Sequence, residues 1–300
     1  MSETRQLRHC GYIAIIGRPN AGKSTLLNCL LGQKLSITSR KPQTTRHRIL
    51  GVKTEPEAQM IYVDTPGLHE AGKHAMNRLM NRAALTALQD VDAVLFVVDE
   101  LRWGDEEKYI LDKLQGMKTP VVLVINKVDK LPTREKLLPH IETLMKLYDF
   151  AAIIPISARN GSNVEAVEAQ VKALLPSAPQ LFPDDQVTDR SERFIAAELI
   201  REKLMRRLGQ ELPYALTVEI EQYSMQNDVI HISALIWVER MAQKAIVIGK
   251  NGGFLKETGK QARHDMEQIF GHKVFLKLWV KVKKKWSDDE RALRSLGYSE

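Results

Sequence analysis

The sequence predicts an α/β protein in which a domain with a mainly parallel sheet is followed by a smaller α+β domain. One observation is that apolar segments of strand length alternate with segments of helix length up to about Leu175, which favours a parallel sheet with helices on both faces. The other is that three prolines fall within residues 176–189, after which the order of expected elements changes. We therefore expect domains at 1–178 and 191–300, joined by a semi-stiff linker at 179–190.

The first domain is expected to alternate strands and helices almost throughout. Its expected strands are 12–16, 47–53, 58–63, 93–98, 121–126 and 152–156. Its expected helices are about 23–32, 75–89, 105–115, 134–148 and 163–174. Ligands of such sheets bind at the carboxyl ends of the strands, so motifs that follow strands carry the most weight.

The pattern G-x-x-x-x-G-K-S lies between the first strand and the first helix, which is the context of a phosphate-binding P-loop. Glycines let the backbone turn its N–H groups toward phosphates, and the helix N-terminus adds partial positive charge. We expect Lys23 to reach the terminal phosphates and the Ser24 hydroxyl to bind Mg²⁺. The expected loop consists of Gly17, Arg18, Pro19, Asn20, Ala21, Gly22, Lys23, Ser24 and Thr25.

A D-x-x-G motif follows the third strand. A carboxylate at this place can hold Mg²⁺ through water, and the glycine N–H can bond the terminal phosphate, so the loop can sense whether that phosphate is present. The residues expected to line the phosphates here are Asp64, Thr65, Pro66, Gly67 and Leu68.

An N-K-x-D motif follows the strand at 121–126. Its aspartate can accept hydrogen bonds from the amino and imino groups of guanine, whereas adenine offers no such donor pair on that edge. Buried acceptors left unpaired would disfavour adenine, so the motif predicts GTP and GDP as ligands. A backbone N–H after the next strand is expected at the guanine oxygen. The residues expected at the base are Asn126, Lys127, Val128, Asp129, Ser157 and Ala158.

GTP hydrolysis depends on charge neutralisation and an oriented water more than on covalent chemistry. The polar loop at 39–46 should supply a threonine that completes the Mg²⁺ shell and orders the loop when GTP is bound. Thr45 is the first choice and Thr44 the alternative. The expected metal ligands are then Ser24, Thr45 and Asp64, and the expected catalytic groups are Lys23, Thr45 and Gly67.

The position after D-x-x-G is occupied by Leu68, where Ras-like GTPases carry a glutamine that orients the attacking water. Leucine cannot hydrogen-bond, so the water must be held by a backbone group, a side chain of the mobile loops or a partner. We expect slow intrinsic hydrolysis. The neighbouring His69 is expected to be an exposed loop residue rather than a base, and the second mobile segment to run over 67–74 with Gly67 and Gly72 as hinges.

The composition narrows the class of protein. The two cysteines form no C-x-x-C pair, no apolar run reaches eighteen residues, and the N-terminus lacks a secretory pattern, so we expect a cytoplasmic protein. The net charge is +7. Between residues 240 and 285 twelve Lys or Arg stand against three Asp or Glu, a local charge of +9 that is typical of a polyanion site.

The second domain should begin with a helix capped by Ser191, followed by a hairpin of strands 215–223 and 229–238. An apolar segment, G-x-x-G, a helix at 253–270 and a strand at 274–282 complete it. A G-x-x-G loop between two helices is the mark of KH domains, in which it clamps about four nucleotides of a single strand. The residues expected to bind RNA are Ile248, Gly249, Lys250, Asn251, Gly252, Lys256, Lys260 and Arg263.

A second basic and aromatic patch lies near the C-terminus. Four alternatives remain for it: an extension of the RNA site, a contact with ribosomal RNA, a membrane contact, or a solvated strand end. Its members are Trp279, Lys281, Lys283, Lys284, Lys285 and Trp286.

A P-loop GTPase domain followed by one KH domain of the bacterial type resembles the bacterial Era family of GTPases over the whole chain. The resemblance rests on the P-loop and on the stretches 36–40, 43–48, 64–69, 211–214 and 288–298. It implies a monomeric switch that acts in assembly of the small ribosomal subunit, with the KH domain on the single-stranded 3′ end of its ribosomal RNA. It also implies peripheral contact with the inner membrane, a link to cell-cycle progression, and a K⁺ ion at Asn20.

Three other classes of function are alternatives to this switch. A membrane-associated signalling GTPase would use the basic patch on anionic lipid. A simple RNA tether would bind RNA and GTP independently of each other. An RNA-modifying enzyme gated by GTP is disfavoured because the sequence carries no cofactor motif and no catalytic cysteine constellation.

Overall fold

The computed structural model describes residues 8–69, 75–131, 133, 135–209, 212–295 and 298. Within these ranges the chain forms two compact units. The first unit comprises residues 8–36, 45–69 and 78–189, and the second comprises 37–44, 75–77 and 190–298. Two short segments from the N-terminal part of the chain therefore pack with the C-terminal part.

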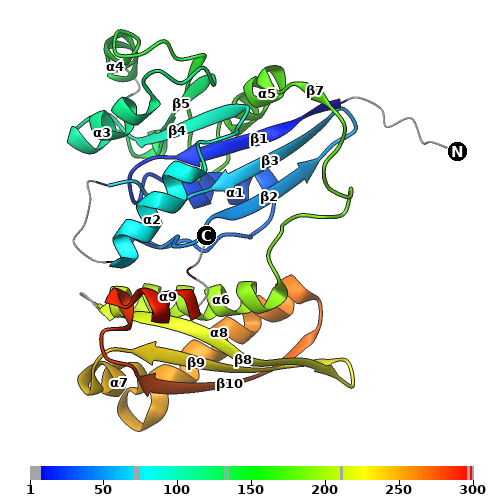
Figure 1. Ribbon diagram of the computed structural model, residues 1–300, viewed down its shortest axis with the longest axis vertical. Helices are drawn as coiled ribbons and strands as arrows, with labels where there is room; N and C mark the ends of the chain where they lie inside the picture. The colour runs from blue at the N-terminus through cyan, green and yellow to red at the C-terminus, as the bar shows by residue number, and fades with distance from the viewer. Residues whose placement is uncertain are drawn as a thin grey trace, which may run out of the picture. The chain divides into compact units, whose positions relative to one another are not determined.

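The first unit contains a mostly parallel sheet with the strand order β2-β3-β1-β4-β5-β6, and β7 pairs with β1 (Figure 1). The β2–β3 and β1–β7 pairs are antiparallel, and the remaining pairs are parallel. The strands are β1 (Arg8–Ile16), β2 (Ile49–Thr54), β3 (Ala58–Asp64), β4 (Ala93–Asp99), β5 (Val121–Asn126), β6 (Ala152–Pro155) and β7 (Ser177–Ala178). The predicted α/β class is confirmed.

Two apolar cores cover the two faces of this sheet, because successive side chains of a strand point to opposite sides. Ile13 and Ile15 of β1 pack with side chains of α1 (Lys23–Leu31) and α5 (Val164–Leu174). Ala14 and Ile16 pack with side chains of α2 (Ala75–Thr86), α3 (Asp105–Leu114) and α4 (Leu137–Leu144). A short 3-10 helix, Val128–Lys130, follows β5.

Residues 179–189, expected as a linker, are held along the first unit. The buried Gln59 accepts hydrogen bonds from Leu181 N (2.8 Å) and Phe182 N (2.9 Å) and donates to Phe182 O (2.8 Å). Val52 N of β2 donates to Val187 O (2.7 Å). The stretch contains a turn in which Gln186 N donates to Pro183 O (3.1 Å). Sequence spacing does not reveal that it is bonded to the edge strand β2.

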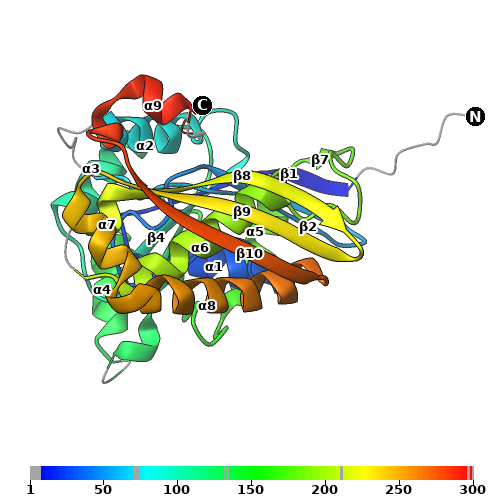
Figure 2. The same cartoon turned by 90° about the horizontal axis from the view of Figure 1, so that it is seen from below.

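The second unit has a three-stranded sheet with the order β10-β9-β8, in which β9 is antiparallel to β8 and parallel to β10. Helices α6 and α8 cover one face of this sheet (Figures 1 and 2). The elements are α6 (Glu192–Arg207), β8 (Leu216–Gln226), β9 (Val229–Val238), α7 (Met241–Ile248), α8 (Gly253–Phe270), β10 (Lys273–Val282) and α9 (Glu290–Ser295), with 3-10 helices at Leu212–Ala215, Lys250–Gly252 and Trp286–Asp288.

Local signals explain the boundaries of these elements. The Ser191 hydroxyl accepts from Phe194 N and caps α6, as the sequence predicted. Asn227 and Asp228 take positive φ (49° and 61°), which fits the tight hairpin turn between β8 and β9. No helix in the described part of the chain is long and apolar enough to cross a bilayer.

Candidate nucleotide site and nucleic-acid interface

The P-loop is shaped by backbone conformations that other residues adopt at a cost. Gly17 has φ +150° and Gly22 has φ +102°. A Cβ at Gly17 would lie 2.2 Å from Val97 O, and one at Gly22 would lie 2.2 Å from Asn126 Nδ2. Helix α1 begins at Lys23 with no side-chain cap, so its first N–H groups remain available to an anion.

Lys23 is positioned over this loop by backbone carbonyls. Its Nζ donates to Gly17 O (3.0 Å) and to Arg18 O (2.9 Å), and the side chain is only 5% exposed. Burial lowers the pKa of Lys23 to about 8, and the nearby Asp64 carboxylate opposes that fall. The ammonium is therefore held in a poorly solvated place, where its attraction to a phosphate is strong.

Three oxygen-bearing side chains meet beside Lys23. Ser24 Oγ donates to Asp64 Oδ2 (2.8 Å) and lies 2.6 Å from Thr45 Oγ1, and all three residues are buried. Asp64 Oδ1 is buried without a hydrogen-bond partner among the described atoms. Two hydroxyls and a carboxylate with an unused oxygen fit a hard cation such as Mg²⁺.

Ser36, which was not among the expected residues, joins this cluster. Its Oγ donates to Asp64 Oδ2 (3.0 Å) and its side chain is 1% exposed. The alternative Thr44 lies elsewhere: its Oγ1 is 2.7 Å from Ser39 Oγ and donates to Lys41 O. The structure thus brings Thr45, and not Thr44, to Ser24.

Burial raises the pKa of Asp64, while hydrogen bonds from Ser24 and Ser36 and the charge of Lys23 oppose that rise. A cation among these oxygens would supply the missing positive charge and keep the carboxylate ionised. The raised pKa of Asp64 and the oxygen atoms around it therefore both favour a cation at this cluster.

The D-x-x-G segment touches the P-loop. A Cβ at Gly67 would lie 2.5 Å from Pro19 N, and Leu68 N donates to Gly17 O (3.2 Å). The Leu68 side chain is fully buried in the apolar core of its sheet face, which explains why this position is not a polar residue. The expectation that His69 is exposed is wrong, because it is half-buried and its Nδ1 lies 3.2 Å from Gly67 O. The candidate hinge Gly72 lies outside the described residues.

Asn126 ties three loops together at the expected base site. Its Oδ1 accepts from Lys127 N (2.7 Å) and Ala158 N (2.9 Å), and its Nδ2 donates to Ala21 O (2.9 Å). Ser157 N donates to Ser162 O, so the backbone N–H groups of Ser157 and Ala158, one of which was expected at the guanine oxygen, are both bonded within the protein. Asn126 therefore orders the site rather than simply pointing at the base.

The Asp129 carboxylate is oriented by a hydroxyl, since Ser157 Oγ donates to Asp129 Oδ1 (2.6 Å). This contact fixes one carboxylate oxygen and leaves the group aimed by a short, strong hydrogen bond. The arrangement suits an acceptor that must meet two donors of a planar base. The sequence named both residues but not their contact.

A group of ion pairs that includes Arg18 of the P-loop was also not predicted from the sequence. Asp99, at the end of β4, pairs with Arg18 and with Lys127 Nζ (2.8 Å), and Lys127 Nζ also donates to Asn20 O (2.6 Å). Burial alone would raise the pKa of Asp99, but Lys127 and Arg18 outweigh it and hold the pKa below its usual range. The available signal was the position of Asp99 at the carboxyl end of a strand.

In the second unit, the loop between α7 and α8 takes backbone conformations that its glycines allow. Gly249 has φ +75°, and a Cβ there would lie 2.6 Å from Phe254 Cβ. Asn251 (φ 51°) and Gly252 (φ 71°) follow, and α8 starts with no side-chain cap. Ile248 is half-buried against the core. The exposed residues of the expected RNA site are Lys250, Asn251, Lys256, Lys260 and Arg263.

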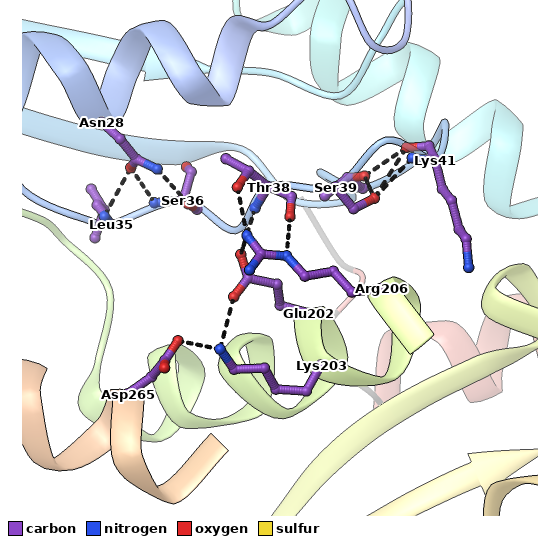
Figure 3. Close-up of polar contacts among 11 residues, drawn as sticks. Asn28, Leu35, Ser36, Thr38, Ser39, Lys41, Glu202, Lys203, Arg206 and Asp265 are labelled. Carbon is purple, nitrogen blue, oxygen red and sulfur yellow. Dashed lines mark hydrogen bonds and ion pairs between the residues drawn. The ribbon is translucent and has the colours of Figure 1, made fainter. Parts of the chain in front are cut away.

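Residues 37–44 are attached to helix α6 (Figure 3). Thr38 N donates to Glu202 Oε1 (2.9 Å), and Arg206 donates to Thr38 O and Thr38 Oγ1 (3.0 Å each). Glu202 is fully buried and lies 3.8 Å from Lys203, whose Nζ donates to Asp265 Oδ2 of α8 (2.5 Å). Polar contacts thus run from the segment 37–44 through α6 to α8.

The P-loop, the D-x-x-G and N-K-x-D loops and the α7–α8 loop define a GTPase joined to a KH domain. A family model described as a 50S ribosome-binding GTPase matches residues 12–127, and a KH domain model matches residues 211–287. GTPase Era of Marinobacter nauticus is 59% identical over 97% of this chain and 95% of that protein. GTPase Era of Pseudomonas savastanoi is 57% identical over the full length of both.

Solved structures agree with these relatives. A crystal structure of Era in complex with MgGDPNP and nucleotides 1506–1542 of 16S ribosomal RNA is 40% identical, with a TM-score of 0.95 over 98% of this chain and 100% of that one. A crystal structure of Aquifex aeolicus Era bound to GDP and aluminium fluoride is 39% identical, with a TM-score of 0.95 over 97% of this chain and 100% of that one. The chain belongs to the Era family of GTPases.

Proposed function

We propose that this GTPase is a molecular switch that holds the single-stranded 3′ end of small-subunit ribosomal RNA and acts in assembly of that subunit in the cytoplasm. The observation that carries the RNA part is the Gly249–Gly252 loop, with its positive φ angles, together with the exposed cations that follow it in the chain. The Era structure solved with a 16S ribosomal RNA segment supports the choice of RNA, since the two folds match along nearly the whole chain. KH loops of this shape clamp about four nucleotides.

The chemistry of hydrolysis follows from the first unit. Lys23 and the N–H groups of the P-loop neutralise the charge that develops on the terminal phosphate. Ser24, Thr45 and Asp64 would hold Mg²⁺, which supplies further positive charge when bound. Because Leu68 is in the core, the attacking water must be oriented by a backbone group, another loop or a partner, and unassisted turnover should be slow.

The stretch 36–45 supports a coupling between nucleotide and RNA. Its two ends, Ser36 and Thr45, are bonded to the cluster around Asp64 and Ser24. Its middle is bonded to α6, and α6 is ion-paired to Asp265 on α8, the helix that carries the cations of the RNA site. A change at the terminal phosphate that moves Thr45 would then shift the hydrogen bonds of 37–44, and by linkage RNA would change nucleotide affinity or hydrolysis.

The test is GTP turnover by the full chain, titrated with an oligonucleotide from the 3′ end of small-subunit ribosomal RNA and with a scrambled one. We expect the cognate strand alone to accelerate turnover and Gly249→Asp to abolish the acceleration. Glu202→Gln should keep GTP and RNA binding but reduce the effect of each on the other, whereas Glu192→Gln on the same helix should not. Unchanged turnover at saturating cognate RNA would reduce the second unit to a tether.

We also propose a K⁺ ion at Asn20, a monomeric state and peripheral contact with the inner membrane. Turnover in KCl against NaCl tests the first. Equal rates in the two salts would remove K⁺ from the mechanism. Sedimentation of the purified chain tests the second. Binding to anionic vesicles tests the third.

A further inference from the structure

The outer face of the second sheet carries aromatic and basic side chains in alternation. On β10 the side chains of even-numbered residues 274–282 pack into the apolar core beneath α6 and α8. The odd-numbered ones therefore point away from the helices. They read Lys273, Phe275, Lys277, Trp279 and Lys281.

The two aromatic residues of this row are unusually exposed. Phe275 is 47% exposed and Trp279 is 45% exposed, although most of their apolar neighbours are buried. Each leaves a large apolar ring in water, which costs free energy that an occupant of the face would recover. On the outer side of one strand, residues two apart lie about 6.6 Å from each other. The rings are therefore separated along the strand with a lysine between them.

The neighbouring strand widens the row into a surface. His231 lies opposite Phe275 in the β9–β10 register with ring centroids 5.3 Å apart, and Trp237 lies opposite Lys281. Lys277 Nζ is 5.3 Å from the centre of the Phe275 ring, and Lys283 Nζ is 5.7 Å from that of Trp237. Rings and ammonium groups are thus interleaved across two strands.

This face is open. Figure 2 shows the strands in front of α6, with α8 running alongside β10, which is the edge strand of the sheet. The acidic groups described on the same face belong to β8, at the opposite edge: Glu219 accepts from Trp237 Nε1 (2.8 Å) and Glu221 lies 3.7 Å from Lys281. The β10 side is therefore basic and aromatic, and the β8 side carries the acids.

We propose that this face is a second binding site for single-stranded RNA, separate from the Gly249–Gly252 loop. Bases stack on the exposed rings and lysines meet the phosphates, as on other sheet surfaces that bind single strands. An anionic lipid surface fits less well. The exposed rings are half-covered on a sheet rather than projecting from a loop tip, and Glu219 and Glu221 would face the lipid charge. Such a site extends the proposed RNA function without depending on the loop.

The test measures affinity of the full chain for a 20-nucleotide poly(U) strand, chosen because it has no secondary structure. The double variant Phe275→Ala, Trp279→Ala removes the rings, and Phe275→Tyr, Trp279→Phe keeps them. We expect the first to weaken binding about five- to hundredfold per ring and the second to leave it within about twofold. Unchanged GTP turnover and melting temperature serve as the folding control.

Tryptophan emission gives a second readout. In a Gly249→Asp background poly(U) should still quench emission, and Trp279→Phe in that background should remove most of the quenching. Poly(U) affinity unaffected by loss of both rings would overturn the proposal. If Gly249→Asp does not weaken RNA binding, RNA binding by the Gly249–Gly252 loop is contradicted instead. The two proposed RNA sites can therefore be refuted independently of each other.

The last measurement is binding of the full chain to vesicles of phosphatidylglycerol and phosphatidylcholine. The proposal expects the ring-removing variant to lose RNA affinity and to show no specific loss of vesicle binding. If that variant keeps RNA affinity and loses only vesicle binding, the face is a membrane surface and the RNA assignment is overturned.

Discussion

The two ligand sites of this protein are built on opposite principles. At the phosphate end of the nucleotide site the functional side chains are buried and already bonded to one another, as Asp64, Ser24 and Thr45 illustrate, whereas Asp129 at the base end is exposed. In the α7–α8 region the cations Lys256, Lys260 and Arg263 are exposed. If these residues bind as proposed, the phosphate end of the first site is a prearranged, poorly solvated constellation, whereas the second site works through surface charge that salt can screen.

This difference predicts how each site responds to change. Removing one member of a buried, hydrogen-bonded set leaves other groups unpaired, so single substitutions should have large effects. Removing one exposed cation among several should have a small, additive effect. Four measurements test whether the two sites differ in this way.

Asp129→Asn should produce the largest loss. The carboxylate, aimed by Ser157, is expected to accept two donors of guanine, and an amide cannot accept both. We expect GTP affinity to fall by about 10⁴-fold, because sites built for such donors discriminate by that order. Xanthosine triphosphate, which presents an acceptor in place of the amino group, should bind the variant better than GTP does. A fall of less than tenfold by calorimetry would remove Asp129 from the base site.

The pH dependence of nucleotide binding should report Lys23. Its pKa in the free protein is about 8, so the ammonium is lost as pH rises through 8, and a bound phosphate must restore the proton. Affinity for GTP should be flat below that pH and fall by up to about tenfold per unit above it. Titration between pH 7 and 9.5 measures this. A Lys23→Arg variant, which stays charged, should lose the slope, and a wild-type slope of zero would contradict the burial effect.

Ser36→Ala should weaken the response to Mg²⁺. The deleted hydroxyl donates to Asp64 Oδ2, and groups that orient metal-binding side chains commonly contribute about 10- to 100-fold in metal affinity. Turnover measured against Mg²⁺ concentration should show a higher half-saturating value with little change at saturation. Ser39→Ala is the matched control, because Ser39 Oγ lies against Thr44 rather than Asp64. Equal shifts in both variants would refute the role of Ser36.

Single substitutions of Lys256, Lys260 and Arg263 by alanine should have the smallest effects. Each should weaken RNA binding a few-fold and reduce the slope of log affinity against log salt by about 0.7 for every phosphate that the protein no longer neutralises. Anisotropy titrations at several KCl concentrations measure both. A variant that loses affinity with an unchanged salt slope would point to an interaction with a base rather than with a phosphate.

The order of elements and the placing of the motifs could be predicted because their signals are local. The P-loop, D-x-x-G and N-K-x-D each follow a strand of apolar residues, and the KH unit is recognisable from its element order and G-x-x-G. Even the choice of Thr45 over Thr44 agrees with where the two hydroxyls lie. In each case the informative residues are neighbours in the chain.

The contacts that the sequence did not reveal join residues that are far apart in the chain. Ser36 meets Asp64 across 28 residues, and Thr38 meets Glu202 across 164. Such pairs leave no periodicity and no composition bias, since a serine or a glutamate is unremarkable where it stands. The role of Gln59 in holding 181–182 is hidden for the same reason.

The bonding of residues 181–188 along the first unit sets the reach of the tether between the units. A free segment of residues 179–190 could span about 40 Å, but the first unit extends to Asp189 and α6 is already capped at Ser191. About two residues, or some 7 Å of chain, remain to connect them. The chain therefore passes between the units through a short stretch here, as it also does on either side of residues 37–44, rather than through a long free linker. An RNA strand held by the second unit consequently stays at high effective concentration near the GTPase.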